Sequence, residues 1–366
     1  MSEIVEKLLR DNVKALTPYE SARRLFAQGN GESQQIWLNA NESPFTNTYS
    51  IDDSRFNRYP DCQPEGVINK YASYSGVAVN NTLVTRGADE GIELLIRAFC
   101  EPGQDKILIC PPTYGMYAIS ALTCDVGVEK SPLNADFSLD LETIFAYKDK
   151  VKLVFICSPN NPTGTSVEPQ QIQSVVEHFA DSALVILDEA YIEFDWHSSW
   201  ASKLSQYPNL VILRTLSKAF ALAGLRCGFT LANEPVINAL LKVIAPYPIA
   251  EPVAQIAQQA LSTAGIENMQ KQVLAIDNQR LTLKHFLQSL DAVQLVGDDK
   301  ANFILFRTAD KSALMDFLVK NQILIRDQSK QLNLQNCLRI TVGNELQNQT
   351  LMNLISVFYS TQETLT

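Results

Sequence analysis

The sequence predicts an α/β fold in which a large, mostly parallel central sheet is sandwiched by helices and joined to a smaller α+β domain. Short apolar runs alternate with helical segments from about residue 41 to residue 246, as in parallel sheets whose strands are connected by helices. A long helical stretch follows, from Pro252 to about Leu290. A shorter mixture of strands and helices then completes the 366 residues.

The expected strands are short runs rich in β-branched and other apolar residues. In the large unit they are Thr82–Arg86, Lys106–Cys110, Lys152–Ile156, Ala183–Leu187, Val211–Thr215 and Cys227–Leu231. In the smaller unit they are Phe303–Phe306, Ile323–Arg326 and Leu338–Val342. The opening segment alternates charged and apolar residues, which indicates an arm. We therefore expect an N-terminal arm at 1–40, a large domain at 41–246, and an interdomain helix with a small domain at 247–366.

Polar residues follow three of these strands. The run Ala183–Leu187 ends in Asp188, Asn161 follows another run, and Lys218 follows a third. In open α/β sheets, ligands bind at the carboxyl ends of the strands. Desolvation in apolar surroundings lowers the pKa of an amine, so Lys218 is a candidate Schiff-base nucleophile. The three residues match the needs of pyridoxal phosphate (PLP): a lysine for the imine, an aspartate for the pyridine nitrogen, and an asparagine for the phenolic oxygen.

Each of these residues also has a plainer interpretation. An isolated lysine at the start of a helix is most often solvated, and an apolar strand that ends in Asp188-Glu189 also occurs in nucleoside triphosphatases. Such enzymes need a G-x-x-x-x-G-K-[ST] loop, which the sequence lacks. The joint occurrence of the three residues therefore favours PLP chemistry.

Composition argues against several other classes of function. The net charge of −10 disfavours nucleic-acid binding, which needs clustered lysine and arginine. No apolar run is long enough to span a membrane, and the first residues do not resemble a signal peptide, so we expect a cytoplasmic protein. The seven cysteines show no C-x-x-C pair and the three histidines are far apart, which predicts reduced thiols and no bound metal.

Several motifs resemble those of the class I and II aminotransferases of PLP fold type I. They are Asn161-Pro162-Thr163-Gly164, Asp188 with Tyr191, Ser217-Lys218, and Gly224-Leu225-Arg226-Cys227-Gly228. Within that family the chain resembles the histidinol-phosphate aminotransferases, through Thr17-Pro18-Tyr19, Leu38-Asn39-Ala40-Asn41-Glu42, Asn57-Arg58-Tyr59-Pro60, Arg86-Gly87-Ala88-Asp89-Glu90-Gly91 and Ala245-Pro246-Tyr247-Pro248. The resemblance extends from about residue 10 to about residue 345 and implies that the arm packs with the small domain.

The resemblance implies a set of PLP-binding residues. They are Ala88, Asp89, Tyr114, Asn161, Asp188, Tyr191, Ser217, Lys218 and Arg226, with Tyr59 from the neighbouring subunit. A helix that begins near Ala88 would hold the phosphate together with Ser217 and Arg226, because free N–H groups at a helix N-terminus attract anions. Tyr114 would stack on the ring, unless it is simply a core residue. The implied catalytic residues are Lys218, Asp188 and Tyr191.

The resemblance also implies substrate-binding residues. Arg339 and Arg326 lie in two expected strands, and their planar guanidinium groups suit carboxylates and phosphates. Either arginine could instead form a structural ion pair. Tyr19 and Tyr247 would close the substrate pocket. Because Tyr59 would reach the partner's cofactor phosphate, we expect a homodimer with shared active sites.

The function that the resemblance implies is transamination between L-histidinol phosphate and 2-oxoglutarate, giving imidazole acetol phosphate and L-glutamate, in histidine biosynthesis. Two rivals use the same fold: an aromatic or broad-specificity aminotransferase, and a phosphoamino-acid decarboxylase. A third alternative is a ligand-binding regulator without turnover. Such regulators usually carry a DNA-binding domain, and the sequence has no basic helix-turn-helix segment.

Overall fold

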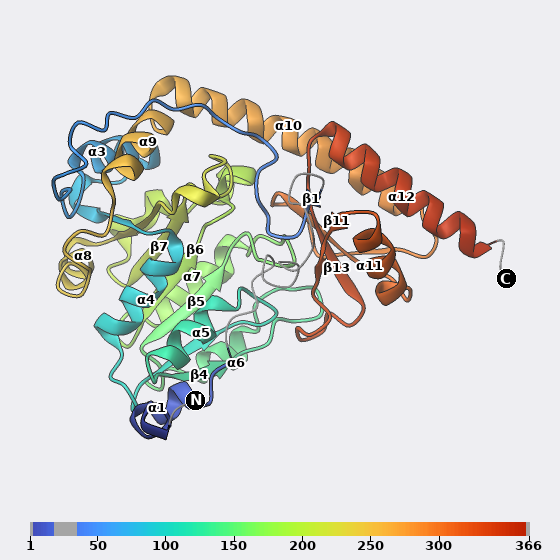
Figure 1. Cartoon of the computed structure of the whole chain (residues 1–366). Helices are drawn as coiled ribbons and strands as arrows, with labels where there is room; N and C mark the ends of the chain where they lie inside the picture. The colour runs from blue at the N-terminus through green and yellow to red at the C-terminus, as the bar shows by residue number, and fades with distance from the viewer. Residues whose placement is uncertain (1–2, 18–34, 364–366) are drawn as a thin grey trace.

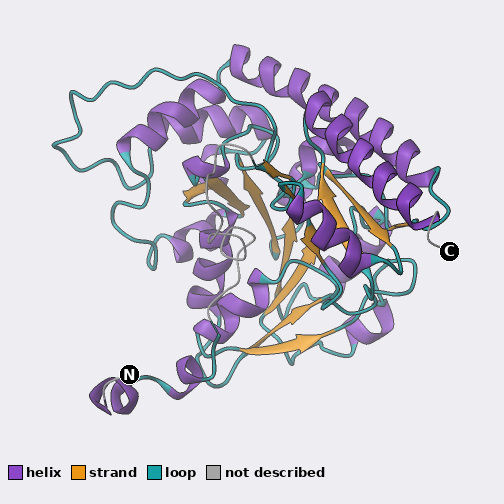
Figure 2. Ribbon diagram, turned by 45° about the vertical axis from the view of Figure 1, so that its right-hand side comes forward, coloured by secondary structure: helices purple, strands orange, loops and turns teal. Residues whose placement is uncertain are grey.

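The large sheet forms the centre of the molecule and has helices on both faces (Figures 1 and 2). A computed structural model describes residues 3–17 and 35–363. Within these residues the sheet has seven strands, in the spatial order β2 (Thr82–Thr85), β8 (Gly228–Ala232), β7 (Leu210–Thr215), β6 (Leu184–Asp188), β5 (Leu153–Cys157), β3 (Lys106–Ile109) and β4 (Gly127–Lys130). Strand β8 runs in the opposite direction to the other six strands. The predicted mostly parallel sheet is therefore confirmed.

The reversed direction of β8 brings its first residue to the edge where the parallel strands end. Gly228 lies opposite Thr85 of β2 and Thr215 of β7, which are the last residues of those strands. The segment that precedes β8, including Arg226, therefore lies at the carboxyl edge of the sheet. The sequence did not predict β4, because Gly127–Lys130 is a partly exposed edge strand without a continuous apolar run.

The described residues also form helices of two kinds. The α-helices are α1 (Glu3–Leu8), α2 (Asp11–Lys14), α3 (Glu65–Ser75), α4 (Ala88–Phe99), α5 (Met116–Thr123), α6 (Leu141–Phe145), α7 (Pro169–His178), α8 (Glu234–Leu240), α9 (Glu251–Ala260), α10 (Thr263–Gln288), α11 (Lys311–Lys320) and α12 (Glu345–Glu363). Short 3-10 helices are η2 (Val79–Asn81), η3 (Ile192–Phe194), η4 (Trp196–Ser198), η5 (Ala201–Gln206) and η6 (Ala223–Leu225). None of the described helices is both long and apolar enough to cross a membrane.

Successive strand residues point to opposite faces of the large sheet, and each set packs against its own helix layer. On one face, Leu153 and Ile186 belong to a core shared with α4, α5 and α8. On the other face, Val154 and Val185 belong to a core shared with α3, α7 and α9. The central strands are therefore apolar on both faces, and polar groups are confined to their ends.

The smaller unit is built on a four-stranded antiparallel sheet. Its spatial order is β12 (Arg326–Asp327), β13 (Cys337–Thr341), β10 (Phe303–Arg307) and β9 (Gln294–Val296). Helices α11 and α12 pack against this sheet together with the C-terminal part of α10. The N-terminal part of α10 packs on the core of the large sheet. One helix thus joins the two units, and α12 runs beside it (Figure 1).

Two expected elements are divided in the structure. The predicted helix from Pro252 to about Leu290 is two helices, because Ser262 caps the start of α10 and its hydroxyl accepts a hydrogen bond from the N–H of Gly265 (3.1 Å). The predicted strand Ile323–Arg326 divides into β12 and β11 (Ile323–Leu324), which pairs in parallel with β1 (Ile36–Trp37). A run of apolar residues does not show where a strand changes its partner.

The described part of the N-terminal segment contacts both units. Nη2 of Arg10 donates to the carbonyl of Thr123 (2.9 Å), and Nδ2 of Asn12 donates to that of Leu122 (3.0 Å), next to α5 of the large unit. Strand β1 pairs with β11 of the smaller unit, and the N–H of Thr341 donates to the carbonyl of Leu38 (2.9 Å). The family resemblance predicts that the arm packs with the small domain. The side chains of residues 10–12 instead contact the large unit, because carbonyl groups at the end of α5 accept their hydrogen bonds. The domain limits 1–40, 41–246 and 247–366 stay a prediction.

Candidate active site

Three of the predicted site residues meet at the carboxyl edge of the large sheet. Asp188 is the last residue of β6, which lies between β5 and β7. The register pairs Asp188 with Cys157 of β5 and Leu213 of β7. Asn161 and Lys218 follow soon after the ends of these two neighbouring strands. Parallel strands therefore bring together residues that are distant in the sequence.

Asp188 is an almost completely buried carboxylate, with an exposed fraction of 2%. Its Oδ2 accepts a hydrogen bond from the hydroxyl of Tyr117 (2.6 Å), and its Oδ1 accepts one from the backbone N–H of Ala190 (3.1 Å). Burial raises the pKa of Asp188 to about 6, although both hydrogen bonds act in the opposite direction. The site thus contains an anionic group that would be stabilised by a cationic partner.

Tyr117 is a site residue that the sequence did not identify. It lies in α5, is completely buried, and stacks on Phe155 of β5 with ring centroids 4.9 Å apart. A buried tyrosine usually finds a hydrogen-bond partner for its hydroxyl. Its position three residues after Tyr114 could have indicated that it belongs to the site. The rings of Tyr114 and Tyr117 lie in the same region, with centroids 5.6 Å apart.

Lys218 is a partly buried amine that contacts the segment that follows β1. Its Nζ donates to the carbonyl of Ala40 (3.3 Å) and lies 5.6 Å from the ring centroid of Tyr191. Burial, and after it the positive charge of Arg339, lower the pKa of Lys218 to about 8. A neutral amine is consequently accessible near neutral pH, as a nucleophile requires.

Tyr191 and Asn161 occupy the space beside Lys218. The hydroxyl of Tyr191, which is buried, accepts a hydrogen bond from Nδ2 of Asn41 (2.8 Å). Burial raises the pKa of Tyr191, so the phenol remains protonated. Oδ1 of Asn161 accepts a hydrogen bond from Nη1 of Arg339. The sequence predicted Tyr191 and Asn161 as site residues but not these partners.

Three groups suited to an anion, here called the anion cup, lie together at the start of α4. Gly87 precedes α4 with φ of +78°, and a Cβ added there would lie 2.7 Å from Nη2 of Arg226. Arg226 has a left-handed backbone (φ 58°), and its Nη1 donates to the hydroxyl of Ser217 (3.4 Å). The helix N-terminus, the hydroxyl and the guanidinium thus converge, and the phosphate-binding role expected of Ala88, Ser217 and Arg226 stays a prediction.

Asp89 joins two of the predicted cofactor residues. Its Oδ2 forms an ion pair with Nη2 of Arg226 (3.2 Å), and its Oδ1 accepts a hydrogen bond from the hydroxyl of Tyr114 (3.0 Å). A carboxylate beside an anion is repulsive, so the side chain of Asp89 is suited to holding Arg226 and Tyr114. Its backbone N–H, in the first turn of α4, is the group suited to a phosphate.

Two arginines of the small sheet face the same region. Arg326 of β12 lies directly opposite Arg339 of β13 in the antiparallel register. Arg339 is buried, its Nη2 donates to the carbonyl of Asn39 (3.0 Å), and its guanidinium carbon lies 5.3 Å from the ring centroid of Phe303. Directly opposite residues of two strands project from the same face. The sheet therefore concentrates positive charge beside Asn161.

The remaining predicted residues lie at the surface or outside the described chain. Tyr59 and Tyr247 stack on each other with centroids 4.4 Å apart, and they are 78% and 50% exposed. The structure therefore brings these two rings together at the surface. Tyr19 lies in residues 18–34, outside the described residues. The described residues contain no group of three or more histidine, cysteine, aspartate or glutamate side chains placed to hold a metal ion.

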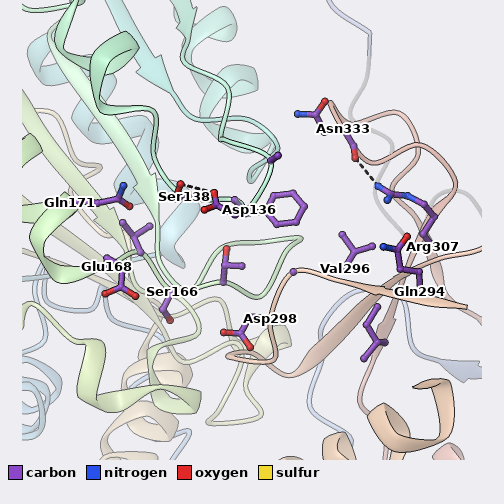
Figure 3. A pocket seen from close by; sticks show the side chains of 16 residues that line it. Asp136, Ser138, Ser166, Glu168, Gln171, Gln294, Val296, Asp298, Arg307 and Asn333 are labelled. Atoms are coloured by element: carbon purple, nitrogen blue, oxygen red, sulfur yellow. Dashed lines mark hydrogen bonds between the residues drawn. The ribbon is translucent and has the colours of Figure 1, made fainter. Parts of the chain in front are cut away.

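A separate pocket of about 820 Å³ lies between the two units. Figure 3 shows Asp136, Ser166 and Glu168 of the large unit near this pocket, facing Asp298 and Arg307 of the smaller one. The predicted site residues in the described part of the chain do not line it. Asp188 and Lys218, whose pKa values are shifted, do not line this pocket, so we do not assign the active site to it.

Comparison with known proteins identifies the family. The family model for aminotransferase class I and II matches residues 24–358. The chain belongs to this family. The roles of Lys218, Asp188 and Asn161 in this aminotransferase stay a prediction.

Two relatives of this aminotransferase are histidinol-phosphate aminotransferases. The protein from Pseudoalteromonas atlantica is 66% identical over 99% of this chain and 97% of its own length. The protein from Yersinia enterocolitica is 56% identical over 93% of this chain and 89% of its own length. In structure, the aminotransferase resembles the histidinol-phosphate aminotransferase from Sinorhizobium meliloti in complex with pyridoxal-5'-phosphate. The TM-score is 0.82 at 21% sequence identity, and the match covers 96% of this chain and 98% of that chain. This last likeness establishes the shared fold.

Proposed function

We propose that this chain is a PLP-dependent aminotransferase that interconverts L-histidinol phosphate plus 2-oxoglutarate and imidazole acetol phosphate plus L-glutamate, in histidine biosynthesis. The observation that carries the proposal is the 66% identity to a histidinol-phosphate aminotransferase over nearly the whole chain. The clustering of Lys218, Asp188 and Asn161 at the ends of adjacent strands supports it.

The groups at the site fit the chemistry of PLP. The hydrogen-bond partners of Asp188 are neutral, and a pyridinium nitrogen about 4 Å away would add about 4 kcal/mol of attraction at an intermediate dielectric constant. The N-terminus of α4, Ser217 and Arg226 suit a phosphate. When bound, PLP supplies an electron-withdrawing ring and carries the amino group between the two substrates.

The side chains then have distinct tasks. Lys218 would hold the cofactor through Nζ, and the same nitrogen would move a proton at the substrate's Cα as a general base and acid. Its lowered pKa suits this task, because part of the amine is neutral near pH 8. Asp188 holds a proton on the pyridine nitrogen. Asn161 and Tyr191 would orient the phenolic oxygen, and Tyr114 would stack on the ring.

The substrates are anions, and the arginine pair suits them. Arg326 and Arg339 lie directly opposite each other across two strands, so their positive charges lie on the same face of the small sheet. A carboxylate or a phosphate can accept two parallel hydrogen bonds from one guanidinium group. We assign the α-carboxylate of glutamate and the phosphate of histidinol phosphate to Arg339, with Arg326 as a second contact. Tyr19 and Tyr247 complete the pocket in this proposal.

A homodimer with shared sites belongs to the same proposal, as does a cytoplasmic location. Tyr59 and Tyr247 form a stacked aromatic pair on the surface. Exposed aromatic side chains are enriched at protein interfaces. In the proposed dimer, the hydroxyl of Tyr59 reaches the PLP phosphate of the partner.

The proposal is tested by parallel assays of the purified protein. With glutamate as amino donor, we expect much faster turnover of imidazole acetol phosphate than of phenylpyruvate, and no decarboxylation of threonine phosphate. Borohydride should attach the cofactor covalently to Lys218, and Lys218→Ala should bind PLP without turnover. Faster turnover of phenylpyruvate would favour the aromatic aminotransferase, and a reduced cofactor on another lysine would contradict the assigned site.

A further inference from the structure

The segment Leu38-Asn39-Ala40-Asn41-Glu42 contacts three residues of the active site at once. The carbonyl of Ala40 accepts a hydrogen bond from Lys218, and the carbonyl of Asn39 accepts one from Arg339. The side chain of Asn41 donates to the hydroxyl of Tyr191. Of these three contacts, the last is the only one made by a side chain of the segment, so it can be removed by substitution.

Asn41 is held in place from several directions. It is 1% exposed and has a left-handed backbone with φ of 54°, a conformation that asparagine tolerates better than most residues. Its backbone N–H donates to Oγ1 of Thr341 (2.9 Å), and its carbonyl accepts from Nδ2 of Asn302 (3.0 Å). The hydroxyl of Thr341 in turn donates to Oδ1 of Asn41 (3.3 Å). Both partners belong to the smaller unit.

These contacts fix the direction of each hydrogen bond. The single hydrogen of the Thr341 hydroxyl points to Oδ1 of Asn41, so the amide NH₂ of Asn41 points to Tyr191. An NH₂ group can only donate. The hydroxyl oxygen of Tyr191 must therefore accept, and its own hydrogen is directed elsewhere.

We propose that Asn41 is a positioning residue that makes the hydroxyl of Tyr191 a hydrogen-bond donor toward the phenolic oxygen of the cofactor. This inference rests on the proposed function. Thr341 lies two residues after Arg339 in β13, so both project from the same face of the small sheet. The sheet that contacts the substrate's anionic group thus also orients Tyr191. The charged groups that face Tyr191 are Arg339, Asp188 and Lys218.

The test is a spectroscopic pH titration of the protein with PLP bound. A donor to the phenolic oxygen favours its anionic form and therefore lowers the pKa of the lysine–cofactor linkage. Asn41→Gly keeps the left-handed backbone without strain and removes the amide. We expect this variant to bind PLP and to raise the pH of the absorption change by about half a unit. We also expect its kcat to fall about tenfold, with unchanged KM for both substrates.

The matched control is Asn336→Gly, because Asn336 has the same left-handed conformation (φ 59°) on the exposed surface of the smaller unit. It should leave the titration and kcat unchanged. A double-mutant cycle separates orientation from general structural damage. In a Tyr191→Phe background, Asn41→Gly should cause no additional shift, because the hydroxyl that it orients is gone.

A second pair of variants covers the case in which Asn41→Gly does not fold. Thr341→Val removes the hydroxyl that fixes the amide and should raise the transition pH, whereas Thr341→Ser keeps a hydroxyl and should raise it less. An unchanged transition pH in Asn41→Gly or Thr341→Val, or an equal shift with and without the Tyr191 hydroxyl, overturns the inference. Failure of the wild-type protein to bind PLP would instead overturn the proposed function.

Discussion

At the scale of single residues, burial moves the two central pKa values toward each other. The pKa of Lys218 falls from 10.5 to about 8, and the pKa of Asp188 rises from 3.8 to about 6. In both cases removal from water disfavours the charged form. The buried strand ends therefore supply an amine that can lose its proton and a carboxyl group that is ready for a cationic partner.

Lys218 should accordingly react as a neutral amine at unusually low pH. Because its folded-state pKa is lowered, the reactive neutral form is populated as the pH rises through about 8. In the cofactor-free protein, modification by an amine-specific reagent should be half-maximal near pH 8 at Lys218, as measured by peptide mass spectrometry. Lys106 is the control, because its hydrogen bond to Glu129 (2.6 Å) raises its pKa. Equal pH profiles for the two lysines would contradict the assigned environment.

The residues that the sequence could locate are those at the ends of apolar strands. Lys218, Asp188 and Asn161 were found because a change from apolar to polar residues is visible in one segment. Tyr117 and Thr341 could not be found in this way. Their roles arise from contacts with Asp188 and Asn41, which are 71 and 300 residues away in the sequence.

At the scale of elements, the anion cup depends on a close approach of β8 to the start of α4. A Cβ added at Gly228 would lie 2.4 Å from the carbonyl carbon of Gly87 and 2.6 Å from the backbone nitrogen of Ala88. Backbone atoms cannot move aside as flexible side chains do. The first residue of β8 must therefore be glycine if the N-terminus of α4 is to stay in place beside Arg226.

We expect Gly228→Ala to lower the free energy of unfolding by about 1–3 kcal/mol, as overpacking in well-packed regions does. It should also weaken PLP binding, because the shift falls on the helix N-terminus. Gly224→Ala is the matched control, since a Cβ at Gly224 meets no atom within 4 Å. Denaturant unfolding and PLP titration of both variants measure the two effects. Equal stability of the two variants would mean that the start of α4 can move.

The elements that the sequence missed have a common physical reason. Strand β4 is a partly exposed edge strand, and β9 has one buried residue, Val296, so neither shows a continuous apolar run. The buried strands β5, β6 and β7 were predicted within one or two residues, because their side chains are apolar on both faces of the sheet.

At the scale of the whole molecule, the two units meet at the loop Asn161-Pro162-Thr163-Gly164. The carbonyl of Thr163 accepts a hydrogen bond from the backbone N–H of Asp298 (2.9 Å). The carbonyl of Gly164 accepts one from the backbone N–H of Lys300 (3.0 Å). Arg339 of the small sheet donates to Asn161 in the same loop. Contacts from both units therefore hold the loop, and a complete site requires both of them.

The surface pair Tyr59 and Tyr247 bears on whether a complete site also requires two copies of the chain. Tyr59 is 78% exposed and stacks on Tyr247, so its hydroxyl is available to a second molecule. If it binds the partner's PLP phosphate, each site contains Tyr59 from one chain and Lys218 from the other. Mixing Tyr59→Phe subunits with Lys218→Ala subunits then yields hybrids in which one site carries both lesions and the other carries neither.

The intact site of such a hybrid should bind PLP as tightly as the wild-type protein and should turn over substrate. The Tyr59→Phe homodimer should bind PLP more weakly, because its phosphate loses one hydrogen bond at both sites. PLP titration of isolated hybrids, prepared with different affinity tags on the two subunits, distinguishes these cases. If Tyr59 served its own chain, every site of the hybrid would carry exactly one lesion and no site of wild-type affinity would form. That result, or sedimentation of the active protein as a monomer, would contradict the shared site.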